Sequence, residues 1–577
     1  MIQTQIAPAN LLPAVLAAVT TVGALIRREF HRPGGPRTAA SKALVDAEVE
    51  HLLKVRLLTL LPCGWQSRET ATLASRDGWE WVVDPHNGAS DFLAGHRGSA
   101  VSVALLRQSD PVLGVVHAPL WPHDGGEMIA WAEGANLSRN GRPVVPVAGF
   151  AEPVVAVGLS GLIEGSGLRA LALPSPAFRL ALASVGEVAA ATSDIDGLDV
   201  WEIAGGLALQ KGAGMRVVDL RGQSIDLRHG AFSGIIGGDP AVIEKFLSDP
   251  PHQIVASARL GLPAVRVADA DRLSKAQGCL LGLLAGDALG SQVEFQAVTE
   301  ITARHPSGPP DLVDGGTWNL IAGQPTDDGE MALELASALL AAGGFDAQVV
   351  AAAYVGWRRS RPFDIGSTTS AGIAALARGG RPVSDSQANG ALMRVAPIGM
   401  ACAGDPVRAA AWATADAGLT HPSAVCRSAS AAFAAAVAAG IAGADGATMA
   451  DVAATHAEEA AVRACVIAAR NVPPADYQRN MGWVLIALQN AFYHLLAGHA
   501  LEPALITTVA SGGDTDTNSA ICGALLGATQ GWTAVPLRWR NAVLTCRPGG
   551  PHPRPAQLWP DRALPVAEAL LTLAQEK

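Results

Sequence analysis

The chain has 577 residues, which is too long for a single hydrophobic core and predicts roughly two to four domains. Hydrophobic residues make up 49% and charged residues 16%, a composition that excludes a disordered chain. The formal net charge of -10 gives no excess of basic side chains, so neither nucleic acid nor an anionic membrane is the expected partner. The predicted substrate is a small molecule or a protein.

The seven cysteines are odd in number and include no CxxC pair, so they predict neither a disulfide framework nor a zinc site. A reducing cytoplasm is the simplest location for such a chain. Near its start, the apolar run "LLPAVLAAVTTVGALI" (11–26) is shorter than a membrane span and has no Lys or Arg before it. We therefore predict a buried first helix there and not a signal peptide.

The first part of the chain mixes helical and alternating patterns. The segments "WEWVVDP" (79–85) and "GSAVSVALL" (98–106) are typical of strands, and 126–144 is typical of a strand pair. After 249–272 the sequence changes to Ala-rich segments with helical spacing. We predict two domains, 1–260 and 270–577.

The second domain opens with a stripe of glycines. Gly278, Gly282, Gly286 and Gly290 recur every four residues, although each glycine costs a helix about 1 kcal/mol relative to alanine. Close approach of another helix would compensate for this cost. A similar spacing recurs in 523–527, so both helices are predicted to pack at the centre of an all-helical domain.

Two acidic clusters each precede a helical pattern. The first is "TDDGEMAL" (326–333) and the second is "GGDTDTNSAICGALLGA" (512–528), while "GDALGSQVE" (286–294) adds Asp287 and Glu294. Each cluster taken alone is explained by helix capping, because Asp and Thr accept hydrogen bonds from the free N–H groups of a first turn. Two matched clusters favour a second interpretation, a site for hard cations.

Convergence of the clusters would bring up to five carboxylates into one cleft, where each like-charged pair at ~4 Å costs on the order of 4 kcal/mol. Protonation or bound cations must relieve that repulsion. Oxygen ligands suit Mg²⁺ or Mn²⁺, and the absence of His and Cys from both clusters disfavours zinc. A site for two such ions is predicted.

Seven motifs in this half resemble the ADP-ribosylglycohydrolases in their order. Besides the three acidic motifs they are "DIGSTT" (364–369), "NGALMRVAPIG" (389–399), "LTH" (419–421) and "GWVLIALQNAF" (482–492). The resemblance spans most of 273–577 and implies an all-helical fold with two Mg²⁺ or Mn²⁺ ions. One departure is Gly329, where many members of the family have another Thr.

The resemblance also implies roles for individual residues. His421 either orders the groups around a ligand or is a structural histidine. Glu294, Asp328 and Asp514 are implied as catalytic residues. The implied metal ligands are Thr326, Asp327, Asp328, Asp514, Asp516 and Thr517. The implied substrate-binding residues are Ser367, Thr368, Asn389, Gly390, Arg394, Gly482, Trp483 and Val484.

The first half resembles the inositol monophosphatase-type phosphatases. The resemblance rests on "WEWVVDPHNGASDFLAG" (79–95), supported by "LVDAEVEHLL" (44–53), "GVVHAPL" (114–120), "GANLSRNGRPV" (134–144) and "WEIAGGLAL" (201–209). It covers roughly 10–250 and implies a layered α/β fold.

The catalytic positions of that family are altered here. Asp84 is kept, but Asn87 and Ala89 replace the second Asp and the Thr of the motif, and Arg68 replaces the first residue of a Glu pair. An amide carries no charge and an arginine opposes Mg²⁺, so we predict a non-catalytic phosphatase-like domain. Its degenerate site comprises Glu69, Asp84, Asn87 and Glu202.

The predicted function is metal-dependent hydrolysis of an ADP-ribosyl N- or O-glycosidic bond, which releases ADP-ribose from a protein or a small molecule. One alternative is a bifunctional enzyme whose first domain is also a Mg²⁺-dependent phosphatase of inositol phosphates, sugar phosphates or phosphoadenosine nucleotides. Another is a regulatory protein that binds ADP-ribose without turnover. The intact ligand clusters argue against this last alternative, because binding alone would not require all six residues.

Overall fold

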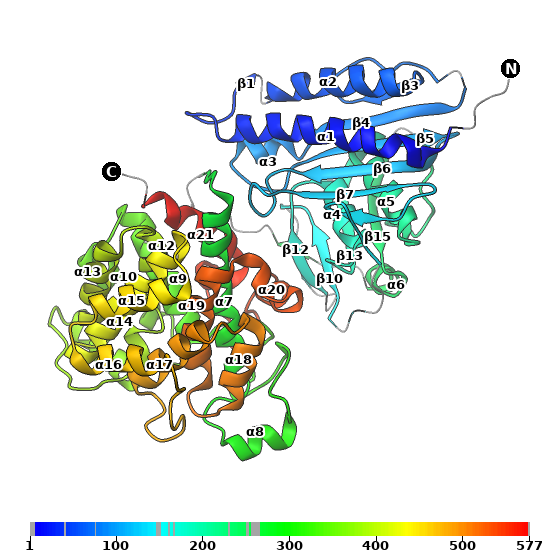
Figure 1. Ribbon diagram of the computed structural model, residues 1–577. Coiled ribbons are helices and arrows are strands. Elements are labelled where there is room, and N and C mark those ends of the chain that lie inside the picture. The colour runs from blue at the N-terminus through cyan, green and yellow to red at the C-terminus, as the bar shows by residue number, and fades with distance from the viewer. Residues whose placement is uncertain are drawn as a thin grey trace. The chain divides into compact units, whose positions relative to one another are not determined.

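The chain divides into two compact units, Met1–Ala258 and Arg259–Lys577. The computed structural model describes residues 6–39, 42–75, 77–145, 150, 152–159, 162–164, 168–228, 231–249, 253–255 and 266–574 (Figure 1). The first unit is layered α/β and the second is helical, as the sequence predicts.

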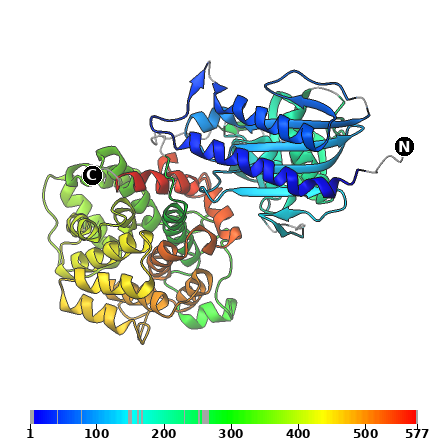
Figure 2. The same ribbon diagram turned by 45° about the horizontal axis from the view of Figure 1, so that its top comes forward.

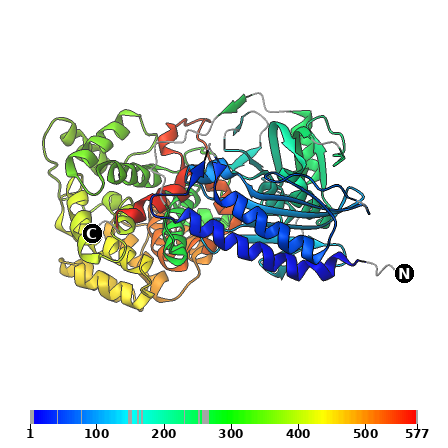
Figure 3. The same cartoon turned by 90° about the horizontal axis from the view of Figure 1, so that it is seen from above.

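The first unit contains two large sheets with helices packed against them (Figure 3). The seven-stranded sheet has the order β3-β4-β5-β6-β7-β8-β9 and the five-stranded sheet the order β12-β10-β13-β15-β14. The strands of the larger sheet are β3 Gly64–Ser67, β4 Trp79–Asn87, β5 Ala100–Arg107, β6 Asp110–Ala118, β7 Glu127–Ala132, β8 Ser138–Arg139 and β9 Arg142–Pro143. Those of the smaller sheet are β10 Val154–Val157, β12 Arg169–Ala172, β13 Ala190–Asp199, β14 Arg216–Asp219 and β15 Ala231–Gly238.

Helices α1 (Pro8–Phe30) and α2 (Val45–Leu60) cover one face of the larger sheet. On α1 the residues Val15, Val19, Val22 and Ile26 follow helical spacing and are fully buried against strand residues such as Val103. The predicted first helix is therefore present, but only the face that packs on the sheet is buried.

Helices α4 (Pro176–Ser184) and α5 (Val200–Gly212) pack against strands of both large sheets, and α6 (Pro240–Ser248) packs on the smaller one. On α5, Val200 and Ala204 bury apolar surface against Val82 and Ala104 of the larger sheet. The unit is thus a stack of alternating helical and sheet layers. The strands predicted at 79–85 and 98–106 correspond to β4 and β5.

Every regular element described in 266–574 is a helix (Figure 2). The α-helices are α7 Ala270–Gly290, α8 Val298–Arg304, α9 Asp327–Ala342, α10 Ala347–Arg359, α11 Ser367–Ala377, α12 Ala396–Ala401, α13 Pro406–Gly418, α14 Ala424–Ile441, α15 Gly446–His456, α16 Ala460–Ala468, α17 Val484–Leu496, α18 Leu501–Ala510, α19 Thr515–Gln530, α20 Leu537–Leu544 and α21 Ala563–Thr572.

Helices α7 and α19 cross at their glycines, so the close helix approach that each glycine spacing predicts is made by these two helices on one another. A Cβ atom on Gly282 would lie 2.2 Å from the carbonyl oxygen of Gly523, and one on Gly278 would lie 2.7 Å from that of Gly527. Any side chain at these positions would separate the helices, so the glycine stripe is explained by backbone contact. The pairing brings the C-terminal end of α7 next to the first turn of α19, because a Cβ on Gly290 would lie 2.3 Å from the Thr515 carbonyl oxygen.

Helices α1 and α14 are long and apolar enough to cross a membrane by length and composition alone. The apolar window of α14 is 83% buried within the protein and that of α1 is 33% buried. In α14 the apolar residues belong to the core of the second unit, and in α1 the buried residues form the stripe that faces the sheet.

Candidate metal centre

The two acidic clusters occupy the first turns of α9 and α19. Thr326 is the N-cap residue of α9 and Asp514 is the N-cap residue of α19, yet neither side chain accepts a capping hydrogen bond within the described part of the chain. Thr326 instead donates its hydroxyl to Asp287 over 3.0 Å. Neither N-cap residue therefore caps its helix with its side chain, and the side-chain oxygens could instead bind a cation.

The clusters meet at Asp328. Its Oδ2 atom accepts from the hydroxyl of Thr517 over 3.3 Å and from that of Thr326 over 3.4 Å. Its Oδ1 atom is buried and has no hydrogen-bond partner among the residues that the structure describes. A buried carboxylate oxygen without a donor costs free energy, so it indicates a position that a cation or proton occupies.

Asp287 holds the turn that carries the first cluster. It is fully buried near the C-terminal end of α7 and accepts from the backbone N–H of Thr326 over 3.1 Å and from that of Gly329 over 2.8 Å. A Cβ atom on Gly329 would lie 2.7 Å from this carboxylate. The glycine that departs from the family pattern thus lets Asp287 approach the turn closely.

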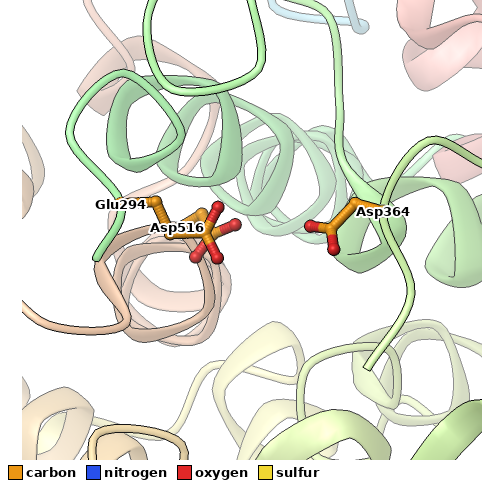
Figure 4. A group of neighbouring side chains, drawn as sticks. All are labelled: Glu294, Asp364 and Asp516. Atoms are coloured by element: carbon orange, nitrogen blue, oxygen red, sulfur yellow. The ribbon is translucent and has the colours of Figure 1, made fainter. Parts of the chain in front are cut away.

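Glu294, Asp364 and Asp516 form a close group of acids in the centre. One carboxylate oxygen from each lies within 4.8 Å of the others (Figure 4). Figure 4 shows Glu294 and Asp516 side by side, with Asp364 pointing toward them from the opposite side. Three carboxylates that face one another across this distance supply the ligand type that Mg²⁺ and Mn²⁺ prefer.

Six acids of the centre have raised pKa values and therefore resist ionisation. Burial, followed by repulsion from the neighbouring Asp364, raises the pKa of Glu294 to about 8. Burial raises the pKa of Asp364 to about 6 and that of Asp287 to about 7. The pKa values of Asp327, Asp328 and Asp516 are raised well above their usual range by burial and then by the charge of other acids. A cation bound among them would allow all of them to ionise.

The segments predicted to bind substrate contact one another beside the acids. Asn389 donates its amide to Asp514 over 2.7 Å and its backbone N–H to the Gly482 carbonyl over 3.0 Å. Thr368 donates to Ser386 over 2.9 Å, and the indole of Trp483 donates to Gln387. The predicted positions lie in 367–368, 389–390 and 482–484. The contacts above connect these three segments, which we together call the amide rim.

Arg394 lies beneath this rim. It is fully buried, and its guanidinium pairs with Asp416 over 3.1 Å and donates to the Gly390 carbonyl over 2.9 Å. Its burial and its pairing with Asp416 indicate that Arg394 supports the loop at Gly390 and does not itself contact a ligand. His421 is also fully buried, and burial lowers its pKa to about 3, so its ring is neutral.

The first unit brings its altered phosphatase residues together in a different way. Asp84 is fully buried and accepts from the backbone N–H of His86 over 3.1 Å and from the side-chain amide of Asn87 over 2.8 Å. The amide oxygen of Asn87 accepts from the Ala177 backbone N–H over 3.1 Å and from the Ser175 hydroxyl. Because a backbone N–H can only donate, the Asn87 amide is fixed with its NH₂ group toward Asp84.

The remaining positions of the degenerate site also have partners within the chain. Glu69 pairs with Lys42 over 3.1 Å and lies 3.6 Å from the guanidinium of Arg68. Glu202 accepts from the backbone N–H of Asp199 at the start of α5. Burial raises the pKa of Asp84 to about 6, while the charge of Arg68 opposes that rise.

Three residues in the second unit contribute more to the metal centre than the sequence indicates. Asp364 belongs to the motif at 364–369, but the resemblance assigned a role only to the residues after it. The sequence presents Asp287 as an extra acid without a position. Its motifs do not include Trp318, whose indole N–H donates to Glu294 over 2.6 Å. An acid at the start of a shared motif was an available signal for Asp364, whereas nothing in the sequence pairs Trp318 with Glu294.

The ADP-ribosylglycohydrolase family model matches residues 268–576, and the inositol monophosphatase family model matches residues 8–249. The chain is 32% identical to the ADP-ribosyl-[dinitrogen reductase] glycohydrolase of Rhodospirillum rubrum, over 47% of this chain and 90% of that protein. It is 27% identical to the ADP-ribosylarginine hydrolase Tri1 of Serratia proteamaculans, over 49% and 79%. The first unit is similar to an inositol-1-monophosphatase of Mesorhizobium japonicum, with 28% identity over 41% of this chain and 94% of that protein.

Proposed function

The chain belongs to the ADP-ribosylglycohydrolase family, and from this premise we propose that its second unit releases ADP-ribose from an ADP-ribosylated protein or small molecule with the help of two divalent cations. The chain is a glycosidic-bond hydrolase with a fused inositol monophosphatase-like domain. The substrate, the metal dependence and the residue roles are the proposed part. They are supported above all by the meeting of both acidic clusters at Asp328, whose Oδ1 atom has no partner among the described residues.

The donor set fits Mg²⁺ or Mn²⁺ because it consists of carboxylate and hydroxyl oxygens. We assign Thr326, Asp327, Asp328, Asp514, Asp516 and Thr517 to the metal site, together with Glu294 and Asp364 at its edge. Bound cations would neutralise the carboxylates and supply positive charge for the ribose hydroxyls to bind.

Hydrolysis breaks the bond between the anomeric carbon and the leaving atom. The electron pair of that bond goes to the leaving atom, which takes up a proton, while a water oxygen bonds to the anomeric carbon and releases a proton. We assign Glu294 to accept the proton from water, because its carboxyl group lies against that of Asp516 and is held by the Trp318 indole. Asp328 and Asp514 would stabilise the positive charge that develops on the ribose ring.

The amide rim is the proposed binding wall for ADP-ribose. Asn389 links it to the acids through Asp514, so a ligand held by the rim would lie beside the carboxylates. The hydroxyl of Thr368 and the exposed indole of Trp483 offer hydrogen-bonding and stacking groups on the same wall.

The test is the release of free ADP-ribose from an ADP-ribosyl-arginine peptide by the full-length protein. We expect release with Mg²⁺, loss with EDTA and loss in Asp514→Asn. Binding of ADP-ribose without release from arginine-linked or serine-linked peptides would support the regulatory protein in place of the hydrolase. Release that EDTA leaves unchanged would refute the metal assignment alone.

For the first unit we propose a non-catalytic role, because its residues do not fit the metal that the phosphatase family uses. The fixed NH₂ group of Asn87 presents hydrogen-bond donors where a cation needs an oxygen ligand, and Ala89 has no hydroxyl to activate water. Phosphate release from inositol 1-phosphate or 3′-phosphoadenosine 5′-phosphate, assayed on the full chain with Mg²⁺ and Mn²⁺, would instead establish the bifunctional enzyme.

A further inference from the structure

Glu294 lies in a turn between two helices. Helix α7 ends at Gly290 and α8 begins at Val298, so the regular hydrogen bonds of a helix do not fix the backbone around Glu294. Its long side chain can rotate about several bonds, and Figure 4 shows its carboxylate beside that of Asp516 and facing that of Asp364. Because neighbouring carboxylates repel one another, these acids do not by themselves hold the side chain in place.

A short loop packs against this turn. Its two ends, Gly315 and Leu320, exchange backbone hydrogen bonds of 2.7 and 2.8 Å, so the loop is closed. Gly316 takes a left-handed conformation at φ 74°, and a Cβ atom there would lie 2.6 Å from the Cα atom of Gln292. A side chain at this position would push the loop away from the turn. We call the segment from Gly315 to Leu320 the Gly315 loop.

Two neighbouring residues of the Gly315 loop bind both the main chain and the side chain of Glu294. The backbone N–H of Thr317 donates to the Ser291 carbonyl over 3.3 Å, and its hydroxyl donates to the Glu294 carbonyl over 3.1 Å. The indole N–H of Trp318 donates to the Oε2 atom of the same glutamate over 2.6 Å. The position of this carboxylate therefore depends on the loop.

The Trp318 indole is itself supported by packing. Its ring centroid lies 6.0 Å from that of Phe363, which in turn lies 4.8 Å from that of His552. The His552 carbonyl accepts from the Gln324 amide over 2.9 Å, which ties the third ring to the chain before α9. This packing restricts the plane of the indole, and the direction of its N–H follows from that plane.

A proton acceptor works only when its oxygen lies within hydrogen-bond reach of the proton, and a displacement of about 1 Å can cost on the order of 100-fold in rate. We propose that Trp318 and Thr317 are positioning residues that fix Glu294 where it accepts the proton from water. They act through Glu294 and are not catalytic residues themselves. This inference rests on the proposed hydrolase function and adds two residues to the groups on which that function depends.

The first test removes the indole donor, with whichever of an ADP-ribosyl-arginine or an ADP-ribosyl-serine peptide the wild type hydrolyses. Trp318→Phe keeps a ring but loses the N–H group, so we expect kcat to fall by about 10- to 100-fold, with KM and the affinity for free ADP-ribose unchanged. Trp357→Phe is the matched control, because the Trp357 indole also donates to a glutamate, Glu330, over 2.7 Å. Glu330 keeps its hydrogen bond from Arg554 over 2.6 Å, so the control should retain kcat within about 3-fold.

Further variants separate positioning from a purely structural role. In a Glu294→Ala protein, the residual release should not fall further when Trp318→Phe is added, because the indole then has no carboxylate to hold. A further fall of about 10-fold would overturn the inference. Thr317→Val should lower kcat by about 3-fold, and Thr317→Ser, which keeps the hydroxyl, should retain the wild-type kcat.

Three other results also decide the inference. An equal loss of kcat in Trp357→Phe would refute it, because kcat would then report a general loosening of the unit. A higher KM or weaker ADP-ribose binding in Trp318→Phe would place the indole at the substrate and refute the positioning role. If the wild type releases ADP-ribose from neither peptide, the proposed function fails, and crystal structures of the wild type and Trp318→Phe test the contact alone: a Glu294 carboxylate that turns away from Asp516 supports positioning, and an unmoved one refutes it.

Discussion

Each unit brings acidic side chains together, but the two units compensate the negative charge in different ways. In the first unit, Asp84 accepts from His86 and Asn87, and Glu69 pairs with Lys42. In the second unit, Glu294, Asp364 and Asp516 face one another, and Asp328 keeps an oxygen without a partner among the described residues. A buried acid therefore indicates a cation site only where the protein itself does not supply the donors.

The largest effect is expected when an acid of the metal centre becomes an amide. Asp328→Asn should lower ADP-ribose release by about 100-fold or more, because it removes a charged oxygen ligand. The same change should raise the stability of the metal-free protein, because an amide does not have to be protonated at neutral pH to remain buried. Enzyme assays with Mg²⁺ and calorimetry with EDTA measure the two effects.

Asp346→Asn is the control for this prediction. Asp346 caps α10 through the backbone N–H groups of Gln348 and Val349, and Asn keeps an oxygen for them while it removes the charge, so the change should lower stability by about 1 kcal/mol or less and leave release unchanged. If Asp328→Asn also lowered the stability of the metal-free protein, the distinction between a capping acid and an acid of the metal centre would fail.

The second prediction concerns pH. Glu294 and Asp287 have pKa values raised to about 8 and about 7, so the folded protein holds protons that the unfolded chain releases above about pH 4. Stability in EDTA should therefore fall as pH rises from 5 to 8, by about 5–10 °C in Tm. Saturating Mg²⁺ should reduce this fall, because the cation takes the place of the protons. A Tm in EDTA that rises with pH would contradict the raised pKa values.

The third prediction concerns a variant of the first unit in which two acids face each other, as acids do in the second unit. Asn87→Asp places a carboxylate 2.8 Å from Asp84 in place of a donor, so the metal-free protein should lose about 1–3 kcal/mol of stability. Millimolar Mg²⁺ should restore part of that loss. Asn87→Ala is the matched control, which should also be destabilised but should not respond to Mg²⁺. Equal Mg²⁺ responses in both variants would show that the amide is not what keeps the cation out.

The features that could be predicted from the sequence are those with a recurring motif or a local pattern. The glycine spacing at 278–290 and 523–527 predicts close helix approach at the centre of the domain, and the crossing of α7 and α19 supplies that approach. The matched acidic clusters predict a common centre, and the contact between Thr517 and Asp328 brings them together. The strands at 79–85 and 98–106 follow from alternation, which is a local property.

The features that could not be predicted depend on partners far apart in the chain. Arg394 lies in a shared motif, yet its role is set by Asp416, which buries the guanidinium. Trp318 and His552 are solitary aromatic residues in loops, and only the folded chain brings both beside Phe363. The distinction between a capping acid and a ligand acid also required the fold, because both occur in the first turn of a helix.

The smallest effect on stability is expected from relieving backbone strain, in which the two sites also differ. Gly88 takes a left-handed conformation next to Ala89 at φ 84°, while Phe295 takes one next to Glu294 at φ 64° with a 57% exposed side chain. A bulky residue is strained there, whereas Asn tolerates it, so Phe295→Asn should raise stability by about 1 kcal/mol in calorimetry. Phe295→Leu, which also removes the ring but keeps the strain, should show no such gain. Equal changes in both variants would mean that the exposed ring, and not the backbone, sets the energy of this loop.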